Sequence, residues 1–238
     1  MKRVFLAALA LAAIGVVSVT AAATAGTPKT SVVYDSTAAN GAPTNQVSYG
    51  PAAYQFSSIG DEVTLGSGAR SLSNVTVTLS SWACQQGTWY DKNCVTQNGA
   101  TFSQPITLSV YHVASDGSRG ELIASKTQTL NVPYRPSASS KCGDGRWMTP
   151  DKQCKNGLAD DVTFSFSGQK LDPTVVYAIS YDPAGPAASL NVAVTDNPPS
   201  VGSTDDPLWI DGAASPDFDG GGSLGYTPMV QFKASNAS

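Results

Sequence analysis

Short segments in which apolar and polar residues alternate recur along most of the chain, and this pattern restricts the fold more than any other sequence feature. Val75, Val77 and Leu79, for example, alternate with threonine and serine. A period of two is typical of a β-strand with one buried face. Glycine, proline, asparagine and aspartate cluster between the segments, where they favour turns. The sequence therefore predicts an all-β protein, a single β-sandwich similar to a jelly roll.

The predicted sandwich domain covers residues 51–238 and follows a loose lead-in at 26–50 that is rich in threonine, serine, asparagine and proline. The lead-in contains one early strand. The expected strands lie at 31–35, 53–56, 61–65, 75–79, 106–111, 123–132, 162–166, 175–179, 190–194 and 230–232.

The four cysteines occur in two copies of one pattern, CQQGTWYDKNC and CGDGRWMTPDKQC. Both copies read Cys-x-x-Gly-x-Trp, then a spacer, then Asp-Lys-x-Cys. Four cysteines allow three pairings, and the duplication favours pairing within each copy, Cys84 with Cys94 and Cys142 with Cys154. The spacing and the single histidine of the chain argue against a zinc site.

Antiparallel neighbours place both cysteine-closed loops at one end of the sandwich, as hairpin loops, together with the loop DPAGPA. Each loop carries a tryptophan at an equivalent position. In one interpretation, each tryptophan packs over its own disulfide as a small core. In the other, Trp89, Tyr90 and Trp147 form an exposed ligand-binding platform beside Asp91 and Asp151, suited to sugar rings or an apolar partner.

Residues 1–25 have the features of a secretory signal peptide, which predicts an extracellular protein. A basic start is followed by the apolar run 4–19 and by the cleavage pattern Ala-Thr-Ala at 23–25. An uncleaved membrane anchor is the alternative, but the run is short and rich in alanine. Cleavage leaves 12 basic and 18 acidic residues, a net charge of −6. This acidic balance argues against nucleic acid as a partner, and no membrane span is expected after cleavage.

No constellation of catalytic residues emerges from the sequence. His112 follows Leu108 and Val110 at intervals of two residues, so alternation along the strand places it on the same face. This predicts a position at the inward end of a strand. The segment GGSLG at 221–225 matches the pattern around the nucleophile of serine hydrolases, but no histidine follows it in the chain. We therefore expect no catalytic residues there.

Aspartates are concentrated in what the sequence predicts to be the last long loop: Asp205, Asp206, Asp211, Asp217 and Asp219. Turn formation explains them most simply, since aspartate before glycine or proline is common in loops. Asp217 and Asp219 in DFDGGG are candidate calcium ligands, although the terminal glutamate of an EF-hand is absent. A pair of these carboxylates would also serve a glycoside hydrolase. No other cofactor is expected.

The stretches IGDEVTLGSGARSLSNVTVTLSSWACQQGTWYDKNCVTQNGATFSQPITLSVY and VPYRPSASSKC, followed by NGLADDVTFSF, resemble a family of uncharacterised secreted β-sandwich proteins of actinomycete-like Gram-positive bacteria. The resemblance covers most of residues 55–195. It implies an extracellular β-sandwich and carries over no activity and no catalytic residues.

These observations predict a secreted, non-enzymatic protein that binds a glycan or cell-wall polymer through its aromatic disulfide loops. One alternative is a structural or interaction protein of the cell envelope, in which the loops only clamp the fold. The other is the carboxylate-dependent glycoside hydrolase.

Overall fold

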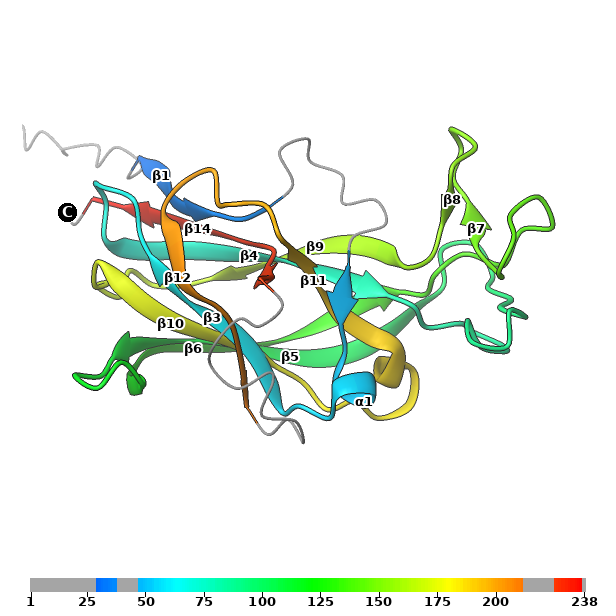
Figure 1. The fold of residues 1–238 in the computed structure, drawn as a ribbon, viewed down its shortest axis with the longest axis horizontal. Helices are drawn as coiled ribbons and strands as arrows, with labels where there is room; N and C mark the ends of the chain where they lie inside the picture. Colours follow the sequence, from blue (N-terminus) through cyan, green and yellow to red (C-terminus); the bar gives the residue numbers. More distant parts are fainter. Residues whose placement is uncertain (1–28, 38–46, 212–224, 237–238) are drawn as a thin grey trace, which may run out of the picture.

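The computed structural model describes residues 29–37, 47–211 and 225–236, which form a sandwich of two antiparallel β-sheets (Figure 1). The prediction of an all-β sandwich is confirmed. Helical structure in these segments is confined to α1 (Pro51–Tyr54) and the 3-10 helix η1 (Gly185–Ser189). No helix of the described segments is long and apolar enough to cross a membrane.

In the described part of the chain, the first sheet consists of β1 (Thr30–Asp35), β2 (Ser48–Tyr49), β4 (Ser71–Ser81), β9 (Leu158–Ser165), β11 (Leu190–Thr195), β13 (Thr227–Pro228) and β14 (Val230–Ser235). The second sheet consists of β3 (Ser58–Thr64), β5 (Thr101–Val113), β6 (Arg119–Pro133), β10 (Thr174–Ser180) and β12 (Ser203–Asp211). A separate two-stranded ribbon pairs β7 (Trp147–Met148) with β8 (Cys154–Lys155).

The strand order is that of a jelly roll. In the first sheet β4 pairs with β9 on one side and with β14 on the other, and β14 pairs with β1. In the second sheet the order is β3-β10-β5-β6, with β12 added beside β3. Most successive long strands cross between the two sheets, with β5 and β6 as a hairpin within one sheet, so residues far apart in sequence become neighbours.

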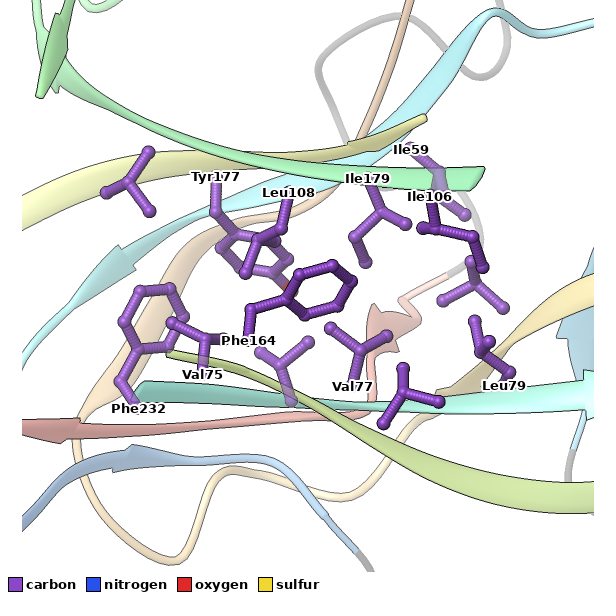
Figure 2. Close-up of a cluster of buried hydrophobic side chains, with 14 of the residues drawn as sticks. Ile59, Val75, Val77, Leu79, Ile106, Leu108, Phe164, Tyr177, Ile179 and Phe232 are labelled. Carbon is purple, nitrogen blue, oxygen red and sulfur yellow. The ribbon is translucent and has the colours of Figure 1, made fainter. Parts of the chain in front are cut away.

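The core lies between the two sheets and is built from the alternating apolar residues. Val75, Val77 and Leu79 of β4 are completely buried, as the sequence pattern predicts. Figure 2 shows them facing side chains of the second sheet, with Phe164 of β9 in the middle of the cluster. Tyr177 closes one side and packs edge-on against Phe232, with ring centroids 5.6 Å apart.

The strand register places three connections at one end of the sandwich, which we call the rim. Ser81, the last residue of β4, lies opposite both Leu158 and Leu190, which begin β9 and β11. The loops that carry the cysteines therefore leave from the same end as the β10–β11 connection, on the right in Figure 1. The prediction that they share one end is confirmed.

The prediction that the two cysteine-closed loops are hairpins is wrong. The first connects β4 to β5 and the second connects β6 to β9, and in each case the two strands lie in different sheets. The connection that contains each loop therefore crosses the gap between the sheets, which are about 10 Å apart in a sandwich. The loops themselves close on their own bases, because the paired cysteines have Cα atoms only 5.3 and 5.6 Å apart.

Near the N-terminus, two expectations need correction. The sandwich begins before residue 51, because β1 pairs with β14 and β2 pairs with β11. The early strand expected at 31–35 is confirmed. Residues 53–56, expected as a strand, instead belong to α1 and the turn after it. Pro51 opens this helix, a position where its missing N–H is not needed, and Gln55 ends it in the left-handed conformation.

The segment containing Asp205, Asp206 and Asp211 is strand β12 rather than a loop. It pairs with β3 at the edge of the second sheet, with register shifts on both sides of Asp206. Proline is tolerated in such an edge strand at an irregularity, which is why the polar, proline-containing sequence did not predict it. Asp217 and Asp219 lie outside the described residues.

Candidate functional site

The cysteines pair within each copy of the pattern, as predicted. Cys84 bonds to Cys94 and Cys142 bonds to Cys154, with Cα atoms 5.3 and 5.6 Å apart. We call residues 84–94 the first disulfide loop and residues 142–154 the second disulfide loop.

The two disulfide loops pack directly against each other. Lys92 of the first loop pairs with Asp144 of the second at 3.2 Å, although both side chains are well exposed. The backbones also approach closely, because a Cβ atom added at Gly145 would lie 2.6 Å from the Cα atom of Lys92. Gly145 also has a φ of 66°, in the left-handed region that favours glycine. The second loop therefore supports the first.

We expect Gly145→Ala to destabilise the protein by about 2–3 kcal/mol, from left-handed strain together with the clash against Lys92. Gly117→Ala is the matched control: its φ is 83°, but nothing lies within 4 Å of the added Cβ atom. Strain alone there costs about 1 kcal/mol. Urea unfolding measures both, and equal losses would contradict contact between the loops.

A buried arginine lies beneath the two loops. Arg135 is only 2% exposed, and its guanidinium donates to the carbonyl oxygen of Gly145 at 2.6 Å. Its backbone N–H donates to the carbonyl oxygen of Ala83, just before the first loop. Burial lowers the pKa of this guanidinium, and its Nε has no partner among the described residues. Arg135 thus connects the second loop to the base of the first.

The tryptophans of the two loops differ in environment, although the sequence places them equivalently. Trp147 of β7 is buried, and its indole N–H donates to the carbonyl oxygen of Gly157 at 3.2 Å. Trp89 is 39% exposed. Trp147 is therefore not available to an exposed surface, and the predicted platform shared by Trp89 and Trp147 is not formed.

Asp91 and Asp151 are exposed, and each accepts a hydrogen bond from a nearby threonine of its own loop. The hydroxyl of Thr88 donates to Asp91 at 2.8 Å, and that of Thr149 donates to Asp151. These bonds shape the turns at the loop tips. In the first loop the turn presents Tyr90, which is 77% exposed, next to Trp89.

A third tryptophan, Trp82, joins the first loop at the end of β4. Its ring packs edge-on against Trp89, with centroids 4.8 Å apart and an angle of 71° between the planes. The Trp82 indole N–H donates to the hydroxyls of Ser80 at 3.1 Å and Ser48 at 3.3 Å. Tyr90 extends the cluster, with its ring centroid 5.9 Å from that of Trp89.

The rings of Trp82 and Trp89 line a groove at the rim, with a volume of about 410 Å³. We call it the aromatic groove. Its lining combines aromatic, small and uncharged polar residues: Ser48, Ala52, Ala53, Tyr54, Trp82, Trp89, Ala188, Ser189 and Asn191. Three separate parts of the chain therefore line one site. They are α1, η1 and the segment that runs from the end of β4 into the first disulfide loop.

Polar groups in the groove are fixed by hydrogen bonds to each other. The side-chain amide of Asn191 donates to the hydroxyl of Ser48 at 3.1 Å. Tyr54 packs edge-on against the buried Tyr49, with centroids 4.7 Å apart. Burial raises the pKa of Tyr49 to about 12. Since none of the lining side chains carries a charge at neutral pH, the groove favours uncharged ligands.

Sequence reasoning identified Trp89 but missed Trp82, Tyr54, Ser48 and Asn191 as members of the same site. The sequence did distinguish Trp82. This tryptophan stands two residues before Cys84, and the second copy of the cysteine pattern has no tryptophan at the matching position. Nothing in the sequence distinguished Ser48 and Asn191, because only the pairing of β2 with β11 brings them together.

The other candidate residues are not part of the groove. His112 is partly exposed, and its Nδ1 lies 2.5 Å from a carboxylate oxygen of Asp172. The side chain of His112 is 43% exposed, so it is not enclosed in the core at the end of β5. Within the described segments, no group of three or more histidine, cysteine and acidic residues is arranged to hold a metal ion.

Fold and site together define an all-β jelly roll with an uncharged aromatic groove between its rim connections. Comparison with protein-family models, with curated proteins and with solved structures finds no match.

Proposed function

We propose that this protein is a non-enzymatic extracellular binding protein that recognises a glycan or cell-wall polymer in the aromatic groove. The observation that carries the proposal is the convergence of Trp82, Trp89 and Tyr54 beside fixed amide and hydroxyl groups. Concave sites that combine apolar walls with a few fixed polar groups are typical of small-ligand binding.

A sugar ring matches this combination of groups. Its C–H face packs against an aromatic ring, while its hydroxyls exchange hydrogen bonds with polar groups at the edge. Trp89 offers an accessible aromatic surface, and Asn191 and Ser48 offer the polar groups. The Trp89 side of the groove is held in place, since Trp89 lies in a disulfide-closed loop that packs on a second one.

An extracellular location is supported by the signal-like sequence of residues 1–25, by the resemblance to secreted proteins and by the two disulfides. Disulfides persist in oxidising compartments and are rare in the cytosol.

Trp89→Ala should weaken glycan binding by about 30-fold, the effect of about 2 kcal/mol expected for a central aromatic contact. Pull-down with insoluble cellulose, chitin, xylan and purified cell wall identifies a bound polymer. Tryptophan fluorescence titration with its soluble oligosaccharides then gives the Kd of each variant.

Trp147→Phe is the matched control, because Trp147 occupies the equivalent position in the second loop but is buried. It should lower the melting temperature and leave the Kd unchanged. No binding to any polymer, or an equal loss of affinity in both variants, would rule out the aromatic groove as a glycan site. The loops would then serve only as clamps of a structural or interaction protein.

A further inference from the structure

A second groove lies at the same rim, with a volume of about 450 Å³. We call it the polar groove. Hydroxyl, carboxylate and amide groups dominate its lining: Ser57, Gln104, Pro105, Thr107, Ser180, Tyr181, Asp182 and Ala184.

The polar groove contains a buried, fixed amide. Gln104 is only 6% exposed, and its side-chain nitrogen donates to the carbonyl oxygens of Pro105 and Asp182, both at 3.1 Å. These two bonds use both amide protons and fix the orientation of the group. Its oxygen Oε1 accepts no hydrogen bond from the described part of the chain, and remains available as an acceptor for a ligand donor.

The two grooves adjoin the same pair of short helices. α1 and η1 contact each other. These two helices and the residues near them line both grooves. Ala53 and Ala188 line the aromatic groove, while Ser57 and Ala184 line the polar groove. Tyr181 of the polar groove also donates its hydroxyl to the carbonyl oxygen of Leu190, the residue before Asn191. The grooves are therefore adjacent parts of one surface.

The polar groove favours ligands that donate hydrogen bonds. Gln104 offers its oxygen and Asp182 its carboxylate, while Thr107 and Ser180 add hydroxyls. No lysine, arginine or histidine is among the described residues that line either groove. An anionic ligand would meet the carboxylate of Asp182 without a compensating cation, which disfavours phosphate-rich or uronic acid polymers.

We propose that the two grooves bind successive units of one uncharged, hydroxyl-rich polysaccharide chain, with a ring stacked on Trp89 and a further unit held by Gln104, Thr107 and Asp182. This inference rests on the proposed function and names its ligand class. Five residues of 3-10 helix span about 10 Å, so a ligand must exceed the length of η1 to reach both grooves.

Affinity should therefore rise about tenfold from disaccharide to hexasaccharide in a neutral series, as the added units gain hydrogen bonds in the polar groove. Isothermal titration uses cello-, chito- and xylo-oligosaccharides, with oligogalacturonides as the acidic series. Thr107→Val should lower the affinity for the hexasaccharide about fivefold and leave that for the disaccharide unchanged.

Thr127→Val is the matched control. The hydroxyls of Thr107 and Thr127 bond to each other at 2.8 Å across β5 and β6, so both variants lose this bond. Thr127 does not line the groove, and its replacement should leave affinity unchanged at every length.

Four results would overturn the inference. Affinity that is independent of ligand length, or equal effects of the two threonine variants, would remove the polar groove from the ligand site. The aromatic groove would remain a glycan site if Trp89→Ala still weakens binding. Tighter binding of the acidic series would overturn the ligand class. Failure to bind either series or any of the insoluble polymers would overturn both this inference and the proposed function.

Discussion

Replacing Phe164 with alanine is expected to lower the free energy of unfolding by about 4 kcal/mol, because the side chain is fully buried between the two sheets. Figure 2 shows Phe164 in the centre of the cluster. The surrounding structure relaxes only partly when such a side chain is removed, so a cavity remains. For a domain of this size the melting temperature should fall by roughly 8–16 °C. Calorimetry and urea unfolding measure the effect.

Phe166→Ala is the control for this prediction. Phe166 follows β9 directly and is only partly buried, at the edge of the same core. Its replacement should have less than half the effect of Phe164→Ala. An equal loss at both positions would contradict the position of Phe164 at the centre of the sandwich.

Removing either disulfide is expected to lower the free energy of unfolding by about 3 kcal/mol. The cysteines are separated by 10 and 12 residues, and the chain-entropy model gives similar values for loops of these lengths. The protein should stay folded at room temperature, since typical domains are stable by about 5–15 kcal/mol. Paired cysteine-to-alanine variants, followed by thermal melting, test each bond separately.

The two disulfide variants should differ in binding. Loss of the bond between Cys84 and Cys94 releases the loop that presents Trp89, so glycan affinity should fall along with stability. Loss of the bond between Cys142 and Cys154 affects a loop that lines neither groove, and its effect on affinity should be smaller. The reverse order would contradict the assignment of the ligand site to the first loop.

Alternation predicted most strands of the sandwich because one face of each is buried and the other is polar. The prediction failed where this physical contrast is weak. β12 lies at a sheet edge, with a proline and two register shifts, and its sequence is as polar as a loop. At the end of β5 burial weakens, and His112, which alternation had placed inward, is only partly buried.

The candidate site was predicted only in part, because local sequence specifies loops but not which loops meet. Duplication of the cysteine pattern correctly predicted both disulfides and, with strand parity, their common rim. It also suggested equal roles for Trp89 and Trp147, whereas the β7–β8 ribbon buries only Trp147. The groove itself depends on Ser48 and Asn191, which become neighbours through the pairing of β2 with β11.

We propose that Trp82 and Trp89 form the ligand surface and that Trp147 does not. Indole N–H signals in a nitrogen–proton correlation spectrum report on each of the 4 tryptophans directly, with assignment by single Trp→Phe variants. On titration with a bound neutral oligosaccharide, we predict shifts of the Trp82 and Trp89 signals and an unchanged Trp147 signal. A shift of the Trp147 signal with those of Trp82 and Trp89 unchanged would contradict this assignment of the ligand surface.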